Sequence, residues 1–283
     1  MGDRQVPRSV LSASALGASA LLLDLDGTLY VAGAPVPGAP ETVAALRGAG
    51  IPFRFVTNTT SRPRTALVER LRGYGFSVHD DELLTPVVAG ARIARAHGCS
   101  ALAPFLPAAA LADLAGFELM GGIASARASR RPDAVLVGDL AEQWSYALMQ
   151  EAFEYVLDGA LFIALSRDRY WRRGDAIALD AGPFVAGLEY AASRTAMLAG
   201  KPSPEFFGAA VASLPPGLAS AQVAMIGDDL WSDVRGAQDA GLRGWLVRTG
   251  KFREDALRES GVVPDRILAS VADLRPALEG TRV

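Results

Sequence analysis

Short apolar runs that end in carboxylates constrain the fold of this chain more than any other feature of its sequence. Residues 21–25 are Leu-Leu-Leu-Asp-Leu, and Asp26 and Gly27 follow directly. Residues 222–229, QVAMIGDD, repeat this arrangement near the other end of the chain. Short apolar runs bounded by turn residues are typical of strands buried on both faces. Because such strands occur mainly in parallel sheets, we expect an α/β fold.

Helical segments alternate with these strands near both ends of the chain. Near the N-terminus the pattern predicts a helix at 41–47, a strand at 51–58 and a helix that begins at Pro63. Near the C-terminus it predicts a helix capped by Ser203, a second helix after residue 230 and a strand at 244–247. Strands that alternate with helices imply a parallel sheet with helical crossovers, as in a Rossmann-like fold.

The middle of the chain has strand candidates of its own, so we predict a second α/β domain inserted at 92–195. Its strands are expected at 101–106, 133–139, 160–166 and 176–180, and its helices at 142–159 and 182–192. The first domain would then consist of residues 17–91 and 196–283, after a flexible tail at 1–16. Such an insertion is plausible because both ends of the chain would then belong to the same domain.

Composition narrows the class of protein. Half of the 283 residues are hydrophobic, and the net charge of −3 is not gathered in blocks, which argues against a nucleic-acid or membrane-surface protein. No apolar stretch reaches the ~18 residues of a membrane helix. Cys99 is the only cysteine, so no intramolecular disulfide can form, and a reducing, cytoplasmic compartment fits. The N-terminal segment resembles a secretory signal peptide. However, it contains several serines and its most apolar part comes only near its end, which favours an untargeted tail.

The first strand ends on two carboxylates, Asp24 and Asp26, where an open parallel sheet binds its ligands. Two such carboxylates repel each other and resist desolvation. A divalent cation such as Mg²⁺ would relieve the repulsion, and so would a division of labour between an ionised and a protonated group. In phosphoryl transfer, one carboxylate can act as nucleophile and form an aspartyl-phosphate, while the other acts as general acid and base.

Such a site needs three further parts, and the ends of other predicted elements supply them. Thr57 and Asn58 could bind phosphoryl oxygens, and Lys201, just before a helix start, could balance their charge. Metal ligands could come from the segment after the second carboxylate-ended strand, which contributes Asp228, Asp229 and Asp233. Each part alone has an ordinary explanation as a turn, a cap or a surface lysine. Their common position at strand ends favours one site.

These segments resemble the four motifs of the haloacid dehalogenase superfamily of phosphotransferases. The matching segments are DLDGTLY, VTNTT, GKP and GDDLWSD. The long insertion between the second and third motifs resembles the NagD-like subclass, which has an α/β cap. Three longer stretches are similar to the branch of HDHD-two-like proteins and phospholysine–phosphohistidine–pyrophosphate phosphatases. They are RFVTNTT, the segment from LFIALSRDRYWRRGD to FVAGLEYA, and MIGDDLWSDVRGAQDAGLRGWLVRTGKFR.

The resemblance implies a Rossmann-like core with an inserted cap, Mg²⁺ as cofactor and a small phosphorylated substrate. The resemblance also implies a role for each motif residue. Asp24 would be the nucleophile and a metal ligand, and Asp26 would be the general acid and base, with its backbone carbonyl on the metal. Thr57 and Asn58 would bind phosphate, Lys201 would contact nucleophile and phosphate, Asp228 would bind the metal, and Asp233 would orient the metal's water shell. Asp229 could replace or assist Asp233. A homodimer formed through the cap is also implied.

Three other functions stay open at this point. A phospho-receiver domain combines the same residue types around Mg²⁺, but it is about half as long and lacks an inserted domain. A dehalogenase would use an aspartate nucleophile without the acid at Asp26, and a phosphomutase does not fit the NagD-like cap. The leaving group would be read by the predicted cap, where the segment 166–175 places four arginines around Tyr170 and Trp171. We favour a solvated strand edge over a substrate contact for this segment.

Overall fold

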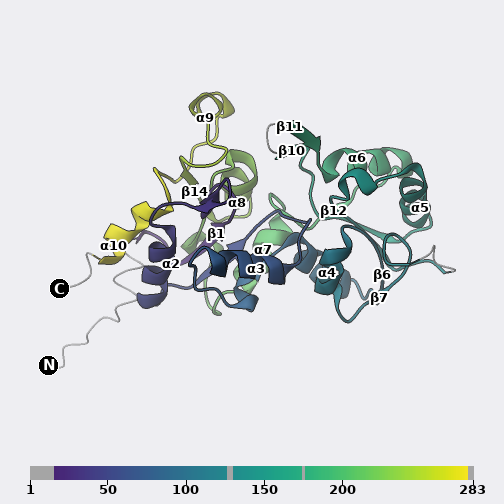
Figure 1. Ribbon diagram of the computed structural model, residues 1–283, viewed down its shortest axis with the longest axis horizontal. Helices are drawn as coiled ribbons and strands as arrows, with labels where there is room; N and C mark the ends of the chain where they lie inside the picture. The colour runs from purple at the N-terminus through teal and green to yellow at the C-terminus, as the bar shows by residue number, and fades with distance from the viewer. Residues whose placement is uncertain (1–15, 126–129, 174–175, 280–283) are drawn as a thin grey trace. The chain divides into compact units, whose positions relative to one another are not determined.

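The computed structural model describes residues 16–125, 130–173 and 176–279 of the chain. The chain forms two compact units. The described residues of Met1–Thr57, Val68–Leu84 and Pro202–Val283 make up the first unit, and those of Asn58–Leu67 and Thr85–Lys201 make up the second. The chain therefore leaves the first unit, builds most of the second and returns (Figure 1).

Six strands form one parallel sheet in the described part of the first unit, in the order β15–β14–β13–β1–β4–β5. Their bounds are β1 Ala20–Asp24, β4 Phe53–Val56, β5 Leu83–Leu84, β13 Val223–Gly227, β14 Arg243–Val247 and β15 Arg266–Leu268. Every residue of β1 and β13 is buried, which explains why both segments are continuous apolar runs rather than alternations. The predicted parallel α/β fold is confirmed.

Helices connect these strands. The α-helices are α2 Ala39–Gly48, α3 Arg64–Gly73, α7 Pro204–Ala212, α8 Gly236–Asp239, α9 Glu254–Ser260 and α10 Arg275–Glu279. Shorter elements are the hairpin β2 Tyr30–Val31 and β3 Ala34–Pro35, and the helical turns η1 Asp80–Glu82, η4 Ser220–Gln222, η5 Leu230–Arg235 and η6 Val271–Leu274. As predicted, Ser203 caps α7: its hydroxyl accepts a hydrogen bond from the Phe206 N–H at 3.1 Å. Helix α10 contacts α2, so the two ends of the first unit meet (Figure 1).

The segment after β13 differs from the regular helix that its sequence predicts. The Asp229 carbonyl accepts hydrogen bonds from the N–H groups of both Asp233 and Val234, which widens the first turns into the π-helix η5. An α-helix follows only over Gly236–Asp239. Wide turns of this kind are frequent at functional sites.

A second parallel sheet, in the order β12–β9–β8–β6–β7, forms the centre of the second unit. Its strands are β6 Ala101–Phe105, β7 Glu118–Leu119, β8 Ala134–Val137, β9 Leu161–Ala164 and β12 Met197–Leu198. The helices are α4 Pro86–Ala96, α5 Tyr146–Leu157 and α6 Ala181–Ala192, with the 3₁₀ turns η2 Ala108–Leu114 and η3 Ala141–Gln143. The strands expected at 101–106, 133–139 and 160–166 are therefore confirmed.

The strand expected at 176–180 forms, but outside that sheet. It is β11 (Ala176–Leu179), which pairs antiparallel with β10 (Tyr170–Arg173) in a separate hairpin. The side chains of Tyr170, Ile177 and Leu179 are 61%, 66% and 60% exposed. Residues 174–175, the last two of the arginine-rich segment 166–175, lie outside the described residues.

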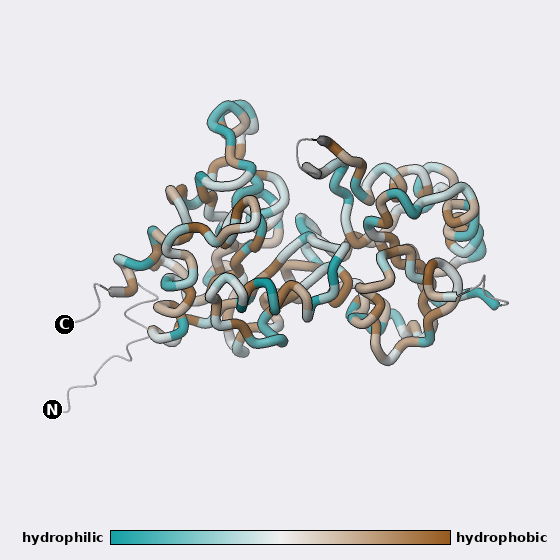
Figure 2. The backbone as a smooth tube through the Cα atoms, viewed as in Figure 1, coloured by the Kyte–Doolittle hydropathy of each residue, from teal (hydrophilic) through white to brown (hydrophobic). Residues whose placement is uncertain are grey.

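Aromatic rings hold the second unit together. Trp144 stacks between Phe105 and Phe184, with ring centroids 6.0 Å and 4.9 Å away. Helix α5 buries Tyr155 and Val156 in the same cluster, as expected for a packed helix. In Figure 2 the apolar colour follows the strands of both units, whereas α9 is mostly hydrophilic.

The predicted tail at 1–16 lies outside the described residues except for its last member. Leu16 is 2% exposed, and its carbonyl accepts a hydrogen bond from Arg266 Nη1 at 3.3 Å. Across the described ranges, no helix combines the length and the apolar character needed to cross a membrane.

Candidate active site

The order of the strands in the first unit creates a topological switch point between β1 and β13. From β1 the chain passes to β4 and β5 on one side, whereas β13 leads to β14 and β15 on the other. Ligands of open α/β sheets bind beyond the carboxyl ends of the strands at such a point. Asp24 is the last residue of β1, and Asp228 directly follows β13. Pairing of β1 with β13 thus brings together residues about 200 positions apart in the chain.

Three carboxylates converge at this point. Asp24, Asp228 and Asp233 each offer a carboxylate oxygen, and these oxygens lie within 4.8 Å of one another. The three residues are only 6%, 3% and 1% exposed. Burial and the charges of Asp24 and Asp233 raise the pKa of Asp228 to about 8. Three buried carboxyl groups at this separation resist ionising together unless a cation lies between them.

Glycines allow the Asp228 carboxylate to approach the backbone this closely. Gly27 and Gly250 both have positive φ angles, of +91° and +61°. A Cβ atom would lie 1.9 Å from Asp228 Oδ2 at Gly27 and 2.0 Å from it at Gly250. Since any larger residue would displace the carboxylate, both positions require glycine for steric as well as backbone reasons.

The loop after β14 also holds this carboxylate, and the sequence did not single it out. The Lys251 N–H donates to Asp228 Oδ2 at 2.6 Å, and the Thr249 hydroxyl donates to the Gly27 carbonyl. The sequence feature that could have indicated it was a glycine-containing turn, Thr249–Gly250–Lys251, that begins two residues after the end of the parallel strand β14. Such turns lie at the same sheet edge as Asp24 and Asp228.

Asp229 has a different role from that of its neighbour. Its Oδ1 accepts hydrogen bonds from the N–H groups of Trp231 and Ser232, both at 3.0 Å, and so caps η5. Its Oδ2 accepts one from Lys251 Nζ at 3.1 Å. Burial opposes ionisation, but Lys251 and the two N–H donors outweigh it and lower the pKa of Asp229. Of the three aspartates in this segment, Asp228 and Asp233 join Asp24, whereas Asp229 caps the helix.

Asp26 lies just beyond β1, and its side chain is exposed. Its Oδ2 accepts a hydrogen bond from the Tyr30 hydroxyl at 2.8 Å. Burial, together with the Asp26 charge, raises the pKa of Tyr30, so this phenol stays protonated and remains a donor. The Asp26 side chain is not one of the three clustered carboxylates. The metal contact predicted for it through its backbone carbonyl remains a prediction.

Thr57 follows β4 in the first unit. It is 2% exposed, and its N–H donates to the Leu84 carbonyl at 3.3 Å. Because β4 pairs with β1 and Val56 lies opposite Asp24, Thr57 is the first residue beyond the strand beside Asp24. Its predicted contact with phosphate remains a prediction.

Asn58 and Lys201 are joined within the second unit, although 143 residues separate them. The Asn58 amide accepts a hydrogen bond from the Lys201 N–H at 2.8 Å and donates one to the Lys201 carbonyl at 2.9 Å. Lys201 is only 3% exposed, so its position is set by contacts with the surrounding protein. The second and third predicted motifs are therefore connected by two hydrogen bonds.

The chain matches known families over most of its length. Residues 21–112 match a family model described as haloacid dehalogenase-like hydrolase, and residues 198–274 match a HAD-hydrolase-like model. Human haloacid dehalogenase-like hydrolase domain-containing protein 2 is 40% identical over 234 residues, which cover 83% of this chain and 85% of that protein.

Two other matches carry phosphatase names. The phospholysine phosphohistidine inorganic pyrophosphate phosphatase of Xenopus laevis is 34% identical over 269 residues, which cover 93% of this chain and 95% of that protein. The solved structure of p-nitrophenyl phosphatase from Archaeoglobus fulgidus is similar with a TM-score of 0.81 at 27% identity. It covers 93% of this chain and 99% of that one.

Proposed function

The chain belongs to the haloacid dehalogenase-like hydrolase family, and on that premise we propose that it is a Mg²⁺-dependent phosphatase. Its substrate would be a small phosphomonoester or related phosphoryl compound, hydrolysed through an aspartyl-phosphate intermediate. The observation that carries the proposal is the buried cluster of Asp24, Asp228 and Asp233 at the switch point of the sheet. The phosphatase names of two relatives support the same reaction class.

The donor set of this cluster fits a magnesium ion. Carboxylate oxygens are the hard ligands that Mg²⁺ prefers, and three buried aspartates carry a charge that a divalent cation would balance. Asp24 and Asp228 would hold the ion with the Asp26 carbonyl, and Asp233 would orient its water shell. When bound, the ion would lessen the repulsion between the phosphoryl group and the carboxylates.

The chemical steps would be shared by Asp24 and Asp26. A carboxylate oxygen of Asp24 attacks phosphorus and forms an acyl phosphate as the bond to the leaving oxygen breaks. Asp26, protonated at that stage, gives its proton to the leaving alkoxide. Its carboxylate then takes a proton from the water that attacks the acyl phosphate, and inorganic phosphate is released. The exposure of Asp26 suits a group that must exchange protons with substrate and water.

Lys201, Thr57 and Asn58 would bind the phosphoryl oxygens. The two hydrogen bonds between Asn58 and the backbone of Lys201 would hold the lysine in place for that contact. We further propose that residues 92–195 are the cap that selects the leaving group, and that the protein is a cytoplasmic homodimer formed through this cap. None of these proposals involves nucleic acid or a membrane.

Turnover of p-nitrophenyl phosphate by the full chain tests the function. We expect multiple turnovers with Mg²⁺, none with excess EDTA and none for Asp24→Asn, because an amide is not a competent nucleophile. Asp81→Asn, a change at an exposed aspartate of η1, is the matched control and should keep full activity. In Asp26→Asn, whose acyl phosphate lacks its base, mass spectrometry should detect a phosphoryl adduct on Asp24.

The outcomes separate an enzyme from its rivals. A single phosphorylation event without turnover in the unaltered chain would instead favour a phospho-acceptor protein. Transfer of phosphate to a second hydroxyl, rather than to water, would favour a mutase. Full activity of Asp24→Asn would contradict the proposed mechanism.

A further inference from the structure

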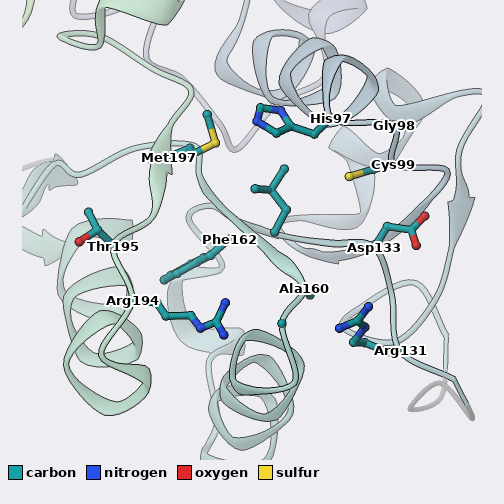
Figure 3. A pocket seen from close by; sticks show the side chains of 12 residues that line it. His97, Gly98, Cys99, Arg131, Asp133, Ala160, Phe162, Arg194, Thr195 and Met197 are labelled. Carbon is teal, nitrogen blue, oxygen red and sulfur yellow. The ribbon is translucent and has the colours of Figure 1, made fainter.

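A hollow lies in the second unit, at the amino ends of its parallel strands (Figure 3). Its volume is about 590 Å³, which is within the range of sites for small molecules. Cys99, Asp133 and Ala160 line it, and each stands just before β6, β8 or β9. Lys201 follows the end of β12 and so belongs to the opposite, carboxyl edge of this sheet. The hollow is therefore not the site of the proposed phosphoryl chemistry.

Two arginines give the hollow a positive wall. Arg131 and Arg194 lie on the same side of it, on either side of Ala160 (Figure 3). Arg131 Nη1 donates to the carbonyl of Asp158, which orients that guanidinium. The Arg194 guanidinium forms no hydrogen bond or ion pair with any side chain or backbone group in the described ranges. Pairs of guanidinium groups bind carboxylate, sulfonate and phosphate oxygens well because each offers a planar set of donors.

The one carboxylate in the lining, Asp133, already has its own donors. Its Oδ2 accepts hydrogen bonds from the Ser100 N–H at 2.8 Å, the Ser100 hydroxyl at 3.0 Å and the Ala101 N–H at 2.9 Å. These bonds connect the start of β8 to the start of β6. Asp133 thus joins two strands of the sheet, and within the described residues no ion pair connects it to Arg131 or Arg194.

Apolar side chains complete the hollow. Phe162 lies beside Arg194, and Leu161 and Met197 also line the hollow. Phe162 is only 4% exposed and belongs to the core of the second unit, so the accessible apolar part of the lining comes from the half-buried Leu161 and Met197. Apolar walls with a few convergent polar groups are the usual make-up of a small-molecule site.

We propose that this hollow binds a small organic anion. Its acidic group would lie between Arg131 and Arg194, and its apolar body would lie against Leu161 and Met197. The proposal does not depend on the proposed phosphatase activity, because its residues and its test are separate from the carboxylate cluster.

Binding of naphthalene-1-sulfonate to the full chain tests the proposal. This probe combines an aromatic body with an anion that cannot be hydrolysed by a phosphatase. Cys99 lines the hollow and is the only cysteine of the chain, so its alkylation by iodoacetamide reports occupancy at a single position. We expect saturable binding by calorimetry and a several-fold slower alkylation of Cys99 when the probe is present.

Matched variants identify the groups responsible. Arg194→Glu should weaken binding at least about tenfold, since one guanidinium–anion contact is replaced by repulsion. Arg92→Glu changes an exposed arginine of α4 outside the lining and should leave the affinity within about twofold. Naphthalene-1-methanol has the same ring system without the charge and should protect Cys99 poorly.

Three results would overturn the proposal. They are the absence of saturable binding and of protection at Cys99, equal affinity of the Arg194 and Arg92 variants, and equal protection by the uncharged alcohol. Circular dichroism of both variants separates a lost site from a lost fold.

Discussion

The backbone N–H of Lys251 donates a hydrogen bond to the Asp228 carboxylate across 2.6 Å, although the two residues are 23 positions apart. The neighbouring Thr249 hydroxyl donates to the carbonyl of Gly27. The loop after β14 therefore contacts both turns that carry the clustered aspartates. Its function would be to hold Asp228 beside Asp24 before any cation or substrate arrives.

Gly250→Ala should weaken magnesium binding and stability together. A Cβ there would lie 2.0 Å from Asp228 Oδ2 and 2.4 Å from Gly27 Cα, so the loop or the carboxylate must move. Gly261→Ala is the matched control, because Gly261 also has a positive φ, +68°, but nothing lies within 4 Å of a Cβ. The control should lose about 1 kcal/mol in urea unfolding from backbone strain alone. The Gly250 variant should lose more and need about tenfold more Mg²⁺ for half-maximal activity. Equal behaviour of the two would exclude the steric explanation.

Without metal, the free energy of unfolding should fall as the pH rises from about 5 to about 8. The folded protein keeps the Asp228 proton until its pKa of about 8, whereas an unfolded aspartate ionises near the ordinary pKa of 3.8. The unfolded state therefore binds fewer protons in this range, and rising pH favours it. Urea unfolding in EDTA at several pH values measures the slope, and Asp228→Asn should flatten it. With saturating Mg²⁺, which binds the ionised form, the decline should be reduced or reversed. A pH-independent stability in EDTA would contradict this expectation.

Asn58→Ala should reduce activity by more than its effect on stability explains. The change removes both hydrogen bonds to the backbone of Lys201, worth about 1–3 kcal/mol, and frees the segment that carries the lysine. We expect kcat to fall about 100-fold with a smaller change in KM. Thr60→Val is the control, because it removes the hydrogen bond from the Asp139 N–H to the Thr60 hydroxyl in the same segment. It should cost similar stability while leaving kcat within a few-fold. A comparable loss of kcat in both variants would point to general loosening of the segment.

Glu82→Gln should destabilise the first unit without affecting turnover. Glu82 accepts hydrogen bonds from both terminal nitrogens of Arg47 and from the His79 N–H, all at 2.8 Å. Burial opposes ionisation, but these donors outweigh it and lower the pKa of Glu82. The resulting stability is present above the ordinary glutamate pKa of 4.5 and is lost as the pH falls through the lower pKa of the folded state.

The loss should be about 1–3 kcal/mol at neutral pH by urea unfolding, and it should shrink in acid. The exposed pair of Arg72 and Asp80 supplies the comparison, since Asp80→Asn should cost less than about 0.5 kcal/mol. A Glu82 variant as stable as the Asp80 variant would show that the buried pair contributes nothing.

The chain's local pattern was enough to predict where strands end and which side chains stand there. Apolar runs bounded by Asp24 and by Asp228 form β1 and β13, and Ser203 caps α7 as its sequence indicates. The strand at 176–180 also forms, but its partner was not predictable. A short apolar run indicates that its backbone tends to be extended. Which strand it pairs with depends on the rest of the fold.

The sequence around several functional residues does not indicate which contacts their side chains make. Asp228 and Asp229 are adjacent and chemically identical, yet one joins the buried cluster and the other caps η5 and pairs with Lys251. Arg131 and Arg194 look like two unrelated surface arginines in the sequence, and they line one hollow only because β8 and β12, which they precede, pair with opposite sides of β9.

The sequence by itself determined the family, the parallel α/β class and the identity of the residues at the strand ends, because these depend on short-range hydrophobic pattern and motif. Only the tertiary structure decided which of those residues meet. Pairing of β1 with β13 brings Asp24 to Asp228, and the wide turn of η5 adds Asp233 to them. The physical reason is that strand order and close packing are set by contacts between distant segments, whose free energies no local pattern contains.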